Sequence, residues 1–154
     1  MMSAAPSVPP AAPPLRLHLV TLGVAALPRA IAFYDALGLV RRDRGTQGVA
    51  FFEAGNVVLA LFPRPALAAD ATMVDSGPGG FSGIALAFNV AGEGEVDATL
   101  AAAQAAGGTV VKAGQRVFWG GYSGYFTDPD GHVWEVAHNP FFPFDDAGRL
   151  VLPD

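Results

Sequence analysis

The spacing of apolar residues predicts an α-helix early in the chain, with short strands around it. A proline stands in the first turn of this helix and a glycine follows its last turn, as expected for a helix start and a C-cap. The apolar positions recur at helical spacing at Leu27, Ile31, Tyr34 and Leu37. Apolar runs bounded by turn residues predict strands over residues 15–24, 39–42, 49–53 and 57–62.

The same order of elements returns in the second half of the chain. Residues 84–90 are predicted to form a strand and residues 93–106 a helix, whose acidic residues lie in the first two turns, where the helix dipole favours them. One face of this helix carries Val96, Leu100 and Ala103. Three more strands are predicted over residues 109–112, 122–127 and 132–137. The pattern therefore predicts two βαβββ units.

A single βαβββ unit covers one face of its sheet with a helix and leaves the other face to be covered. Two units are therefore expected to pair around a shared cleft in an α+β fold, and a ligand would bind in that cleft. We expect the first module over about residues 15–62 and the second over about 83–138, joined by a loop at 63–81. The whole domain then covers residues 15–140, between a disordered Pro/Ala-rich tail at 1–14 and a C-terminal extension at 141–154.

A predicted hairpin near the end of the second module provides the strongest candidate for a site. Residues 128–131, Asp-Pro-Asp-Gly, predict a tight turn, because proline fixes φ, aspartate bonds the local backbone and glycine tolerates positive φ. Along residues 132–137, period-two alternation separates Trp134 and Val136 from Glu135. If Trp134 and Val136 pack against a helix, Glu135 faces the cleft, where it can act as a general base or as the polar anchor of a ligand.

Further candidates lie close to this hairpin in the sequence. Trp119, Tyr122 and Tyr125 belong to a glycine-rich stretch that would let a ligand or backbone approach closely, and their polar tips suit ligand contact. His138 stands where the last strand leaves the sheet, so we expect it at the mouth of the cleft. The run of phenylalanines at 141–144 is expected to cover the cleft or to form a dimer contact, and we predict a homodimer.

Composition excludes several classes of protein. The formal net charge of -5 repels phosphate backbones, so no nucleic-acid partner is expected. The chain has no cysteine, which excludes disulfides, thiolate metal sites and a cysteine nucleophile. No apolar run reaches the roughly 18 residues of a membrane span, and residues 1–14 lack the basic and apolar regions of a secretory signal. We therefore predict a cytoplasmic protein without a membrane partner.

Two segments, LVTLGVAALPRAIAFYDALGL in the first module and FWGGYSGYFTDPDGHVWEV in the second, resemble the vicinal oxygen chelate superfamily. This superfamily includes glyoxalase I, bleomycin-resistance proteins and extradiol dioxygenases, and the chain is most similar to small bacterial glyoxalase-like proteins of unassigned activity. The resemblance covers about residues 17–140. It implies a divalent metal held by four side chains, one near the start and one near the end of each module's sheet.

Position by position, the resemblance places one metal donor in this chain. The last ligand position falls on Glu135, whereas the others fall on Leu19, on Leu59 or Ala60, and on Gly83. A divalent metal normally needs at least three protein donors, so we expect no cofactor. Leu19 is then expected to line the ligand cleft.

Two functions follow from these observations. The first is metal-independent binding of an apolar or aromatic small molecule. The second is a lyase, isomerase or dioxygenase that uses Glu135 as a general base, or that binds a metal through unmatched donors. The unmatched donors available are Glu53, Gln47, Gln115 and His138.

Overall fold

The computed structural model describes residues 7–42 and 44–154, and it contains two βαβββ modules. In the first module, β1 runs parallel to β4 at one edge of a four-stranded sheet with the order β1-β4-β3-β2. Helix α1 contacts β4 of this sheet. The elements of this module are β1 (Leu19–Val24), α1 (Leu27–Ala36), β2 (Val40–Arg42), β3 (Ala50–Ala54) and β4 (Val57–Pro63).

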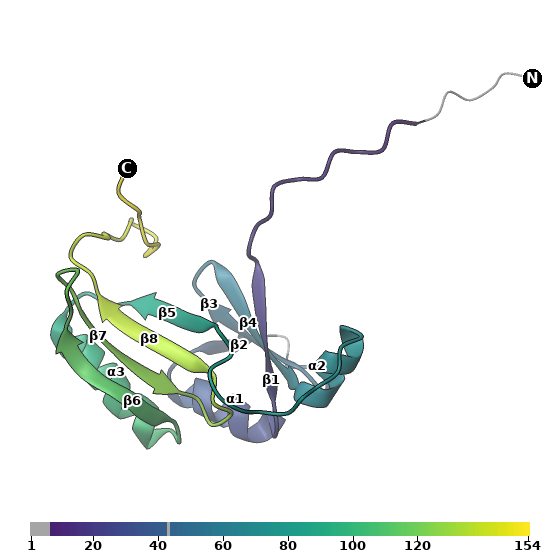
Figure 1. Ribbon diagram of the computed structural model, residues 1–154, viewed down its shortest axis with the longest axis horizontal. Coiled ribbons are helices and arrows are strands. Elements are labelled where there is room, and N and C mark those ends of the chain that lie inside the picture. The colour runs from purple at the N-terminus through teal and green to yellow at the C-terminus, as the bar shows by residue number, and fades with distance from the viewer. Residues whose placement is uncertain (1–6, 43) are drawn as a thin grey trace, which may run out of the picture.

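The second module repeats this topology with the order β5-β8-β7-β6, and β5 runs parallel to β8 (Figure 1). Helix α3 packs on β6, β7 and β8 and buries Val96, Leu100 and Ala103, the face predicted from the sequence. The two predicted modules and the α+β class are therefore confirmed. The elements of this module are β5 (Ala85–Asn89), α3 (Glu93–Ala105), β6 (Thr109–Arg116), β7 (Tyr122–Thr127) and β8 (Val133–His138).

Three predicted elements need correction. Helix α2 (Arg64–Asp70) occupies part of the predicted loop at 63–81. None of its residues is fully buried, so its sequence lacks the helical spacing of apolar residues from which a helix is predicted. Strand β1 begins at Leu19 instead of residue 15, because its partner strand begins only at Val57. Strand β6 continues to Arg116 instead of ending at residue 112.

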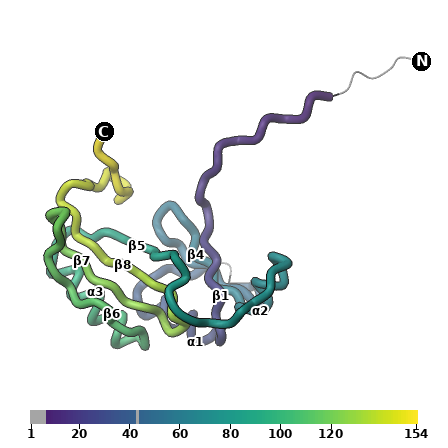
Figure 2. Tube along the Cα trace, in the orientation of Figure 1, coloured from purple at the N-terminus to yellow at the C-terminus, as the bar shows by residue number. Residues whose placement is uncertain are grey.

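The tail predicted at residues 1–14 lies partly outside the described residues, which begin at residue 7. Residues 7–18 form neither helix nor strand, and Figure 2 shows them leading away from both sheets. None of the helices in the described part of the chain is long and apolar enough to cross a membrane.

The two modules share one hydrophobic core in which Tyr34 of α1 is a central residue. Its ring lies 6.1 Å from the ring of Trp134 on β8, and its hydroxyl donates a 2.7 Å hydrogen bond to Oδ2 of Asp128. Trp134 Nε1 in turn donates to the Tyr34 hydroxyl at 3.1 Å. Burial raises the pKa of Tyr34, and the neighbouring Asp128 carboxylate raises it further. The predicted Asp-Pro-Asp-Gly turn therefore holds the first module as well as its own hairpin.

Candidate functional site

Three polar side chains form a row across the face of the second sheet that lies opposite α3. Val136 is fully buried in the core, so Glu135 points to the other face of β8, as the alternation predicted. Tyr125 on β7 pairs with Glu135, and Lys112 on β6 pairs with Tyr125. Cross-strand pairs of this kind bring side chains on one face within reach of each other.

Two irregularities in β6 place its polar residues on this face. The register with β7 shifts once between Val110 and Lys112, and again between Lys112 and Gln115. Each shift inserts one extra residue and so reverses which side chains face the helix. Lys112 and Gln115 therefore both stand opposite cavity-facing partners on β7, although the two positions have opposite parity in the sequence.

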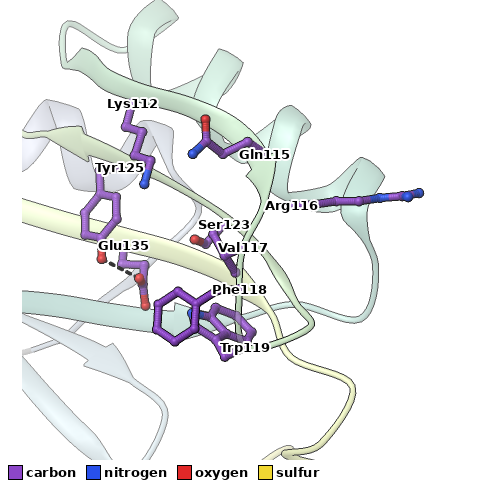
Figure 3. Close-up of a pocket in the computed structure, with 9 residues that line it drawn as sticks. All are labelled: Lys112, Gln115, Arg116, Val117, Phe118, Trp119, Ser123, Tyr125 and Glu135. Carbon is purple, nitrogen blue, oxygen red and sulfur yellow. Dashed lines mark hydrogen bonds between the residues drawn. The ribbon is translucent and has the colours of Figure 1, made fainter.

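Tyr125 and Glu135 form the central pair of the row. The Tyr125 hydroxyl donates a 2.5 Å hydrogen bond to Glu135 Oε2, as Figure 3 shows. This hydrogen bond is the main cause that raises the pKa of Tyr125, followed by its burial. The Lys112 ammonium lies 6.0 Å from the centre of the Tyr125 ring. The phenol fixes one carboxylate oxygen, and the described hydrogen bonds leave Oε1 for a ligand.

A cavity of about 320 Å³ lies over this row. It contains both charge types, because Lys112 and Glu135 line it together, and Gln115 and Ser123 add neutral polar groups. Its aromatic wall comes from the tip of the β6–β7 hairpin (Figure 3). The complete lining is Lys112, Gln115, Arg116, Val117, Phe118, Trp119, Ser123, Tyr125 and Glu135.

A second cavity of about 430 Å³ adjoins the first and is more apolar. The C-terminal extension forms part of its wall, and Glu135 and Trp119 belong to both cavities. The second module, the C-terminal extension and Asn139 between them supply the whole lining. The lining residues are Asn89, Trp119, Glu135, Ala137, Asn139, Phe141, Phe142 and Leu150.

Two glycines fix the position of Trp119 between the cavities. At the hairpin tip, Val117 N–H donates to the carbonyl of Gly121 at 3.0 Å, and Gly120 adopts a φ of 93° that favours glycine. A Cβ on Gly121 would overlap the Trp119 ring, so the indole lies directly on this backbone. A Cβ on Gly120 would lie 2.8 Å from the Phe141 ring. The hairpin tip and the C-terminal extension thus pack against each other here.

Replacing Gly121 by alanine is expected to move the Trp119 ring, because the new methyl group needs the space that the indole fills. The methyl group would also lie 2.5 Å from the His138 carbonyl oxygen, which is part of the backbone and cannot rotate away. We expect a changed tryptophan fluorescence spectrum and a loss of about 1–3 kcal/mol of stability. Gly79→Ala is the matched control, because nothing lies within 4 Å of its added Cβ. Equal spectra and melting temperatures for both variants would contradict this placement of Trp119.

The structure brings together three of the residues that the sequence selected as a site. Glu135, Trp119 and Tyr125 line the same cavity. Leu19 and Tyr122 line neither cavity; Leu19 lies on the other sheet, at β1. Tyr122 and Tyr125 lie three positions apart on one strand, an odd step, so they face opposite sides of the sheet.

Tyr122 and His138 pair with each other across β7 and β8, on the side away from the cavities. The Tyr122 hydroxyl donates to Asp97 Oδ1 of α3 at 2.8 Å, and this bond is the main cause that raises the pKa of Tyr122. A ring nitrogen of His138, Nδ1, lies 3.3 Å from the carbonyl oxygen of Val90. A ligand role for Leu19, Tyr122 or His138 stays a prediction that the geometry does not support.

Lys112, Asn89 and Leu150 join the site although the sequence did not select them, whereas Phe142 belongs to the run at 141–144 that was expected either over the cleft or at a dimer contact. Lys112 was placed at the end of a strand, and only the register shifts of β6 show which face it takes. Asn89 follows from the parallel pairing of β5 with β8, which sets it beside Ala137. This pairing joins segments that are far apart in the sequence, so no local pattern contains it.

Comparison with known proteins identifies the family. The model of the Glyoxalase/Bleomycin resistance protein/Dioxygenase superfamily matches residues 16–136. The chain therefore belongs to this superfamily. The resemblance of its sequence predicted this membership, and its two βαβββ modules agree with it. A search of the curated proteins gives no match.

Among solved structures, the chain is similar to a glyoxalase-related enzyme from Fulvimarina pelagi, with 33% identity over 90% of this chain and 99% of that one and a TM-score of 0.81. It is also similar to a protein of unknown function from Agrobacterium tumefaciens, with 27% identity over 82% and 96% of the two chains and a TM-score of 0.65. A lactoylglutathione lyase from the same organism gives 26% identity over 83% and 96% and a TM-score of 0.60.

The donor set of this chain does not fit the four-ligand metal implied by the superfamily. Of the matched positions, Leu59 is buried in the core, and Leu19 and Gly83 offer no side-chain donor. Within residues 7–42 and 44–154, no group of three or more His, Asp or Glu side chains could hold a metal ion. Glu135 instead accepts a hydrogen bond from a tyrosine. Metal independence itself stays a prediction.

Proposed function

We propose that this chain is a metal-independent member of its superfamily that binds a small molecule over the second sheet, with Glu135 as the main polar anchor. The observation that carries the proposal is that Glu135 lines both cavities while Tyr125 holds one of its oxygens. An ionised carboxylate beside apolar walls is costly unless it has partners, and a ligand N–H or O–H would be a further partner.

A second function, proton transfer, is favoured by the same Tyr125–Glu135 pair. A carboxylate that a phenol holds in position can take a proton from a carbon next to a carbonyl group and return it to the neighbouring carbon, as in an isomerase or lyase. Tyr125 donates to Glu135 Oε2, so Oε1 is the oxygen that would take the proton from the ligand and return it. Like the first function, this second function requires a ligand that lies against Glu135 over the second sheet.

The proposal is tested by a thermal-shift screen with a library of small apolar and aromatic compounds. A compound that binds the folded state alone raises the melting temperature, and the stabilisation grows with the logarithm of its concentration relative to its dissociation constant. Hits are then mapped by the change in tryptophan fluorescence that Trp119→Phe removes, since this indole borders both cavities and Trp134 also fluoresces. A library without any saturable binder, or hits that leave Trp119 unaffected, would reject the proposal. The homodimer predicted from the sequence is a separate expectation for sedimentation to decide.

Removal of metal ions is expected to change nothing measurable. Because Glu135 is the sole donor among the matched ligand positions, no metal binding energy should be linked to folding. Purified protein should contain no stoichiometric metal by elemental analysis, and dialysis against a chelator should leave the melting temperature and the affinity for screened ligands unchanged. One zinc, nickel, manganese or iron per chain, with a lower melting temperature after chelation, would contradict this expectation.

A further inference from the structure

The two cavities share Glu135 and Trp119 but differ in chemistry. We propose that they are two compartments of one site for an amphipathic ligand, with a zwitterionic head beside Lys112 and Glu135 and an aromatic tail beneath the C-terminal extension. This inference rests on the proposed binding function and adds the class of ligand to it.

The head compartment presents one cation, Lys112 on β6, and one anion, Glu135 on β8, on the two strands that flank β7. Lys112 and Glu135 both pair with positions on β7 that face the cavity, so a ligand head can contact both at once. Arg116 does not add a second free cation, because its Nε lies 3.5 Å from Glu93 Oε1 and its side chain points away from the other lining residues in Figure 3. An ammonium group opposite Glu135 and a carboxylate opposite Lys112 would match these charges.

The tail compartment is closed by a small hairpin formed by the C-terminal extension. A bridge pairs Phe144 with Leu150, and the Val151 N–H donates to the Pro143 carbonyl at 2.8 Å. The turn of this hairpin is held by a 2.7 Å ion pair between Arg149 and Asp145. The Arg149 backbone N–H also donates to Asp145 Oδ1 at 2.8 Å, and this hydrogen bond holds the pKa of Asp145 below its ordinary value. The extension therefore has a defined shape, which directs Phe142 and Leu150 to the cavity.

Trp119 connects the two compartments. Its ring lies on the Gly121 backbone and borders both cavities, so a ligand that occupies both can contact the indole as well as Glu135. Aromatic rings pack well in offset or edge-on contact with indole, phenyl and leucine side chains. The tail that fits this path is therefore aromatic, and an α-amino acid with an aromatic side chain has the complete arrangement of head and tail.

The test measures the affinities of L-phenylalanine and 4-phenyl-L-phenylalanine by calorimetry, with 2-phenylethylamine as a probe that lacks the carboxylate. The second ring should improve affinity by roughly tenfold, because it buries further apolar surface. Phe142→Ala should remove most of this gain. Phe144→Ala is the matched control on the same hairpin, since Phe144 is exposed and lines neither cavity, and it should keep the gain.

The head is tested with Lys112→Met, which keeps the stem of the side chain and removes its charge. This variant should lose roughly tenfold or more in affinity for both amino acids and should bind 2-phenylethylamine as well as the wild-type protein does, because only the amino acids carry a carboxylate. Circular dichroism checks that each variant is folded. If Phe142→Ala does not fold, Leu150→Ala tests the tail compartment in its place.

The outcomes separate this inference from the proposed function. If neither amino acid binds at millimolar concentration, or if Phe142→Ala and Phe144→Ala have equal effects, the inference of two compartments is wrong. A screened ligand whose binding depends on Glu135 but not on Phe142 or Lys112 would overturn the inference and leave the proposed function in place. A screen that finds no saturable ligand would overturn both the inference and the proposed function.

Discussion

Replacement of Glu135 by glutamine is expected to weaken ligand binding by roughly 10- to 100-fold, because a hydrogen bond to a charged group contributes about 1.5–3 kcal/mol. The melting temperature of this variant should stay the same or rise. Glutamine keeps the shape of the side chain and can accept the Tyr125 hydrogen bond, while the cost of holding a charge in a partly buried site disappears. Thermal unfolding and calorimetry on the same preparations measure both quantities.

Glu53→Gln provides the matched control for this prediction. Glu53 is an exposed carboxylate on β3 whose only described ion pair is a surface contact with Arg42 at 3.0 Å. Such a pair contributes about 0–1 kcal/mol, and the residue lines neither cavity, so binding should be unchanged. The opposite pattern, in which Glu135→Gln lowers stability and leaves affinity intact, would show that this carboxylate serves the sheet and not a ligand.

The spacing of apolar residues and the positions of turn-forming residues were sufficient to predict the regular parts of the fold. Helix α1 ends where Gly38 adopts a φ of 87°, and strand β7 has the predicted bounds, because each is determined by residues next to it in the sequence. Glu135 could be assigned to the cavity face for the same reason, since β8 alternates without interruption between core and cavity. Local patterns were adequate wherever one strand kept a constant register.

The rest of the site depends on contacts that no local pattern records. The register shifts of β6 reverse the facing of Lys112 and Gln115, and their positions cannot be read from a strand that was expected to end at residue 112. For the phenylalanines at 141–144 the sequence offered a cleft cover and a dimer contact as alternatives, and only the fold shows that the C-terminal extension packs on Gly120 and lines the second cavity. The selection of Tyr122 together with Tyr125 ignored the alternation that separates them.

The turn at Asp128 shows both kinds of information in one residue. Its Oδ1 accepts hydrogen bonds from the backbone N–H groups of Asp130 and His132, both at 2.9 Å, which is the local role that the sequence predicted. Its Oδ2 accepts from Tyr34, 94 positions earlier in the chain. The same turn reaches the first module again through Asp130, whose Oδ1 accepts from the Ala25 N–H at 2.8 Å.

Asp128→Ala is therefore expected to have the largest effect on stability. Asp128 is 3% exposed, and its removal leaves the Tyr34 hydroxyl and two backbone N–H groups without their acceptor. Each buried donor left unpaired costs about 1–3 kcal/mol, so the loss should be about 3 kcal/mol or more. For a chain of this size that corresponds to a decrease of roughly 6–12 °C in melting temperature.

Two further variants separate the parts of this effect. Tyr34→Phe removes the bond between the modules and keeps the turn, so it should cost about 1–2 kcal/mol, and the double variant should lose less than the sum of the two single losses, because the residues are direct partners. Asp146→Ala, in the exposed C-terminal turn, should stay within about 0.5 kcal/mol of the wild-type protein. If denaturant unfolding gives Asp128→Ala and Asp146→Ala the same stability, the hydrogen bonds of Asp128 do not hold the modules together.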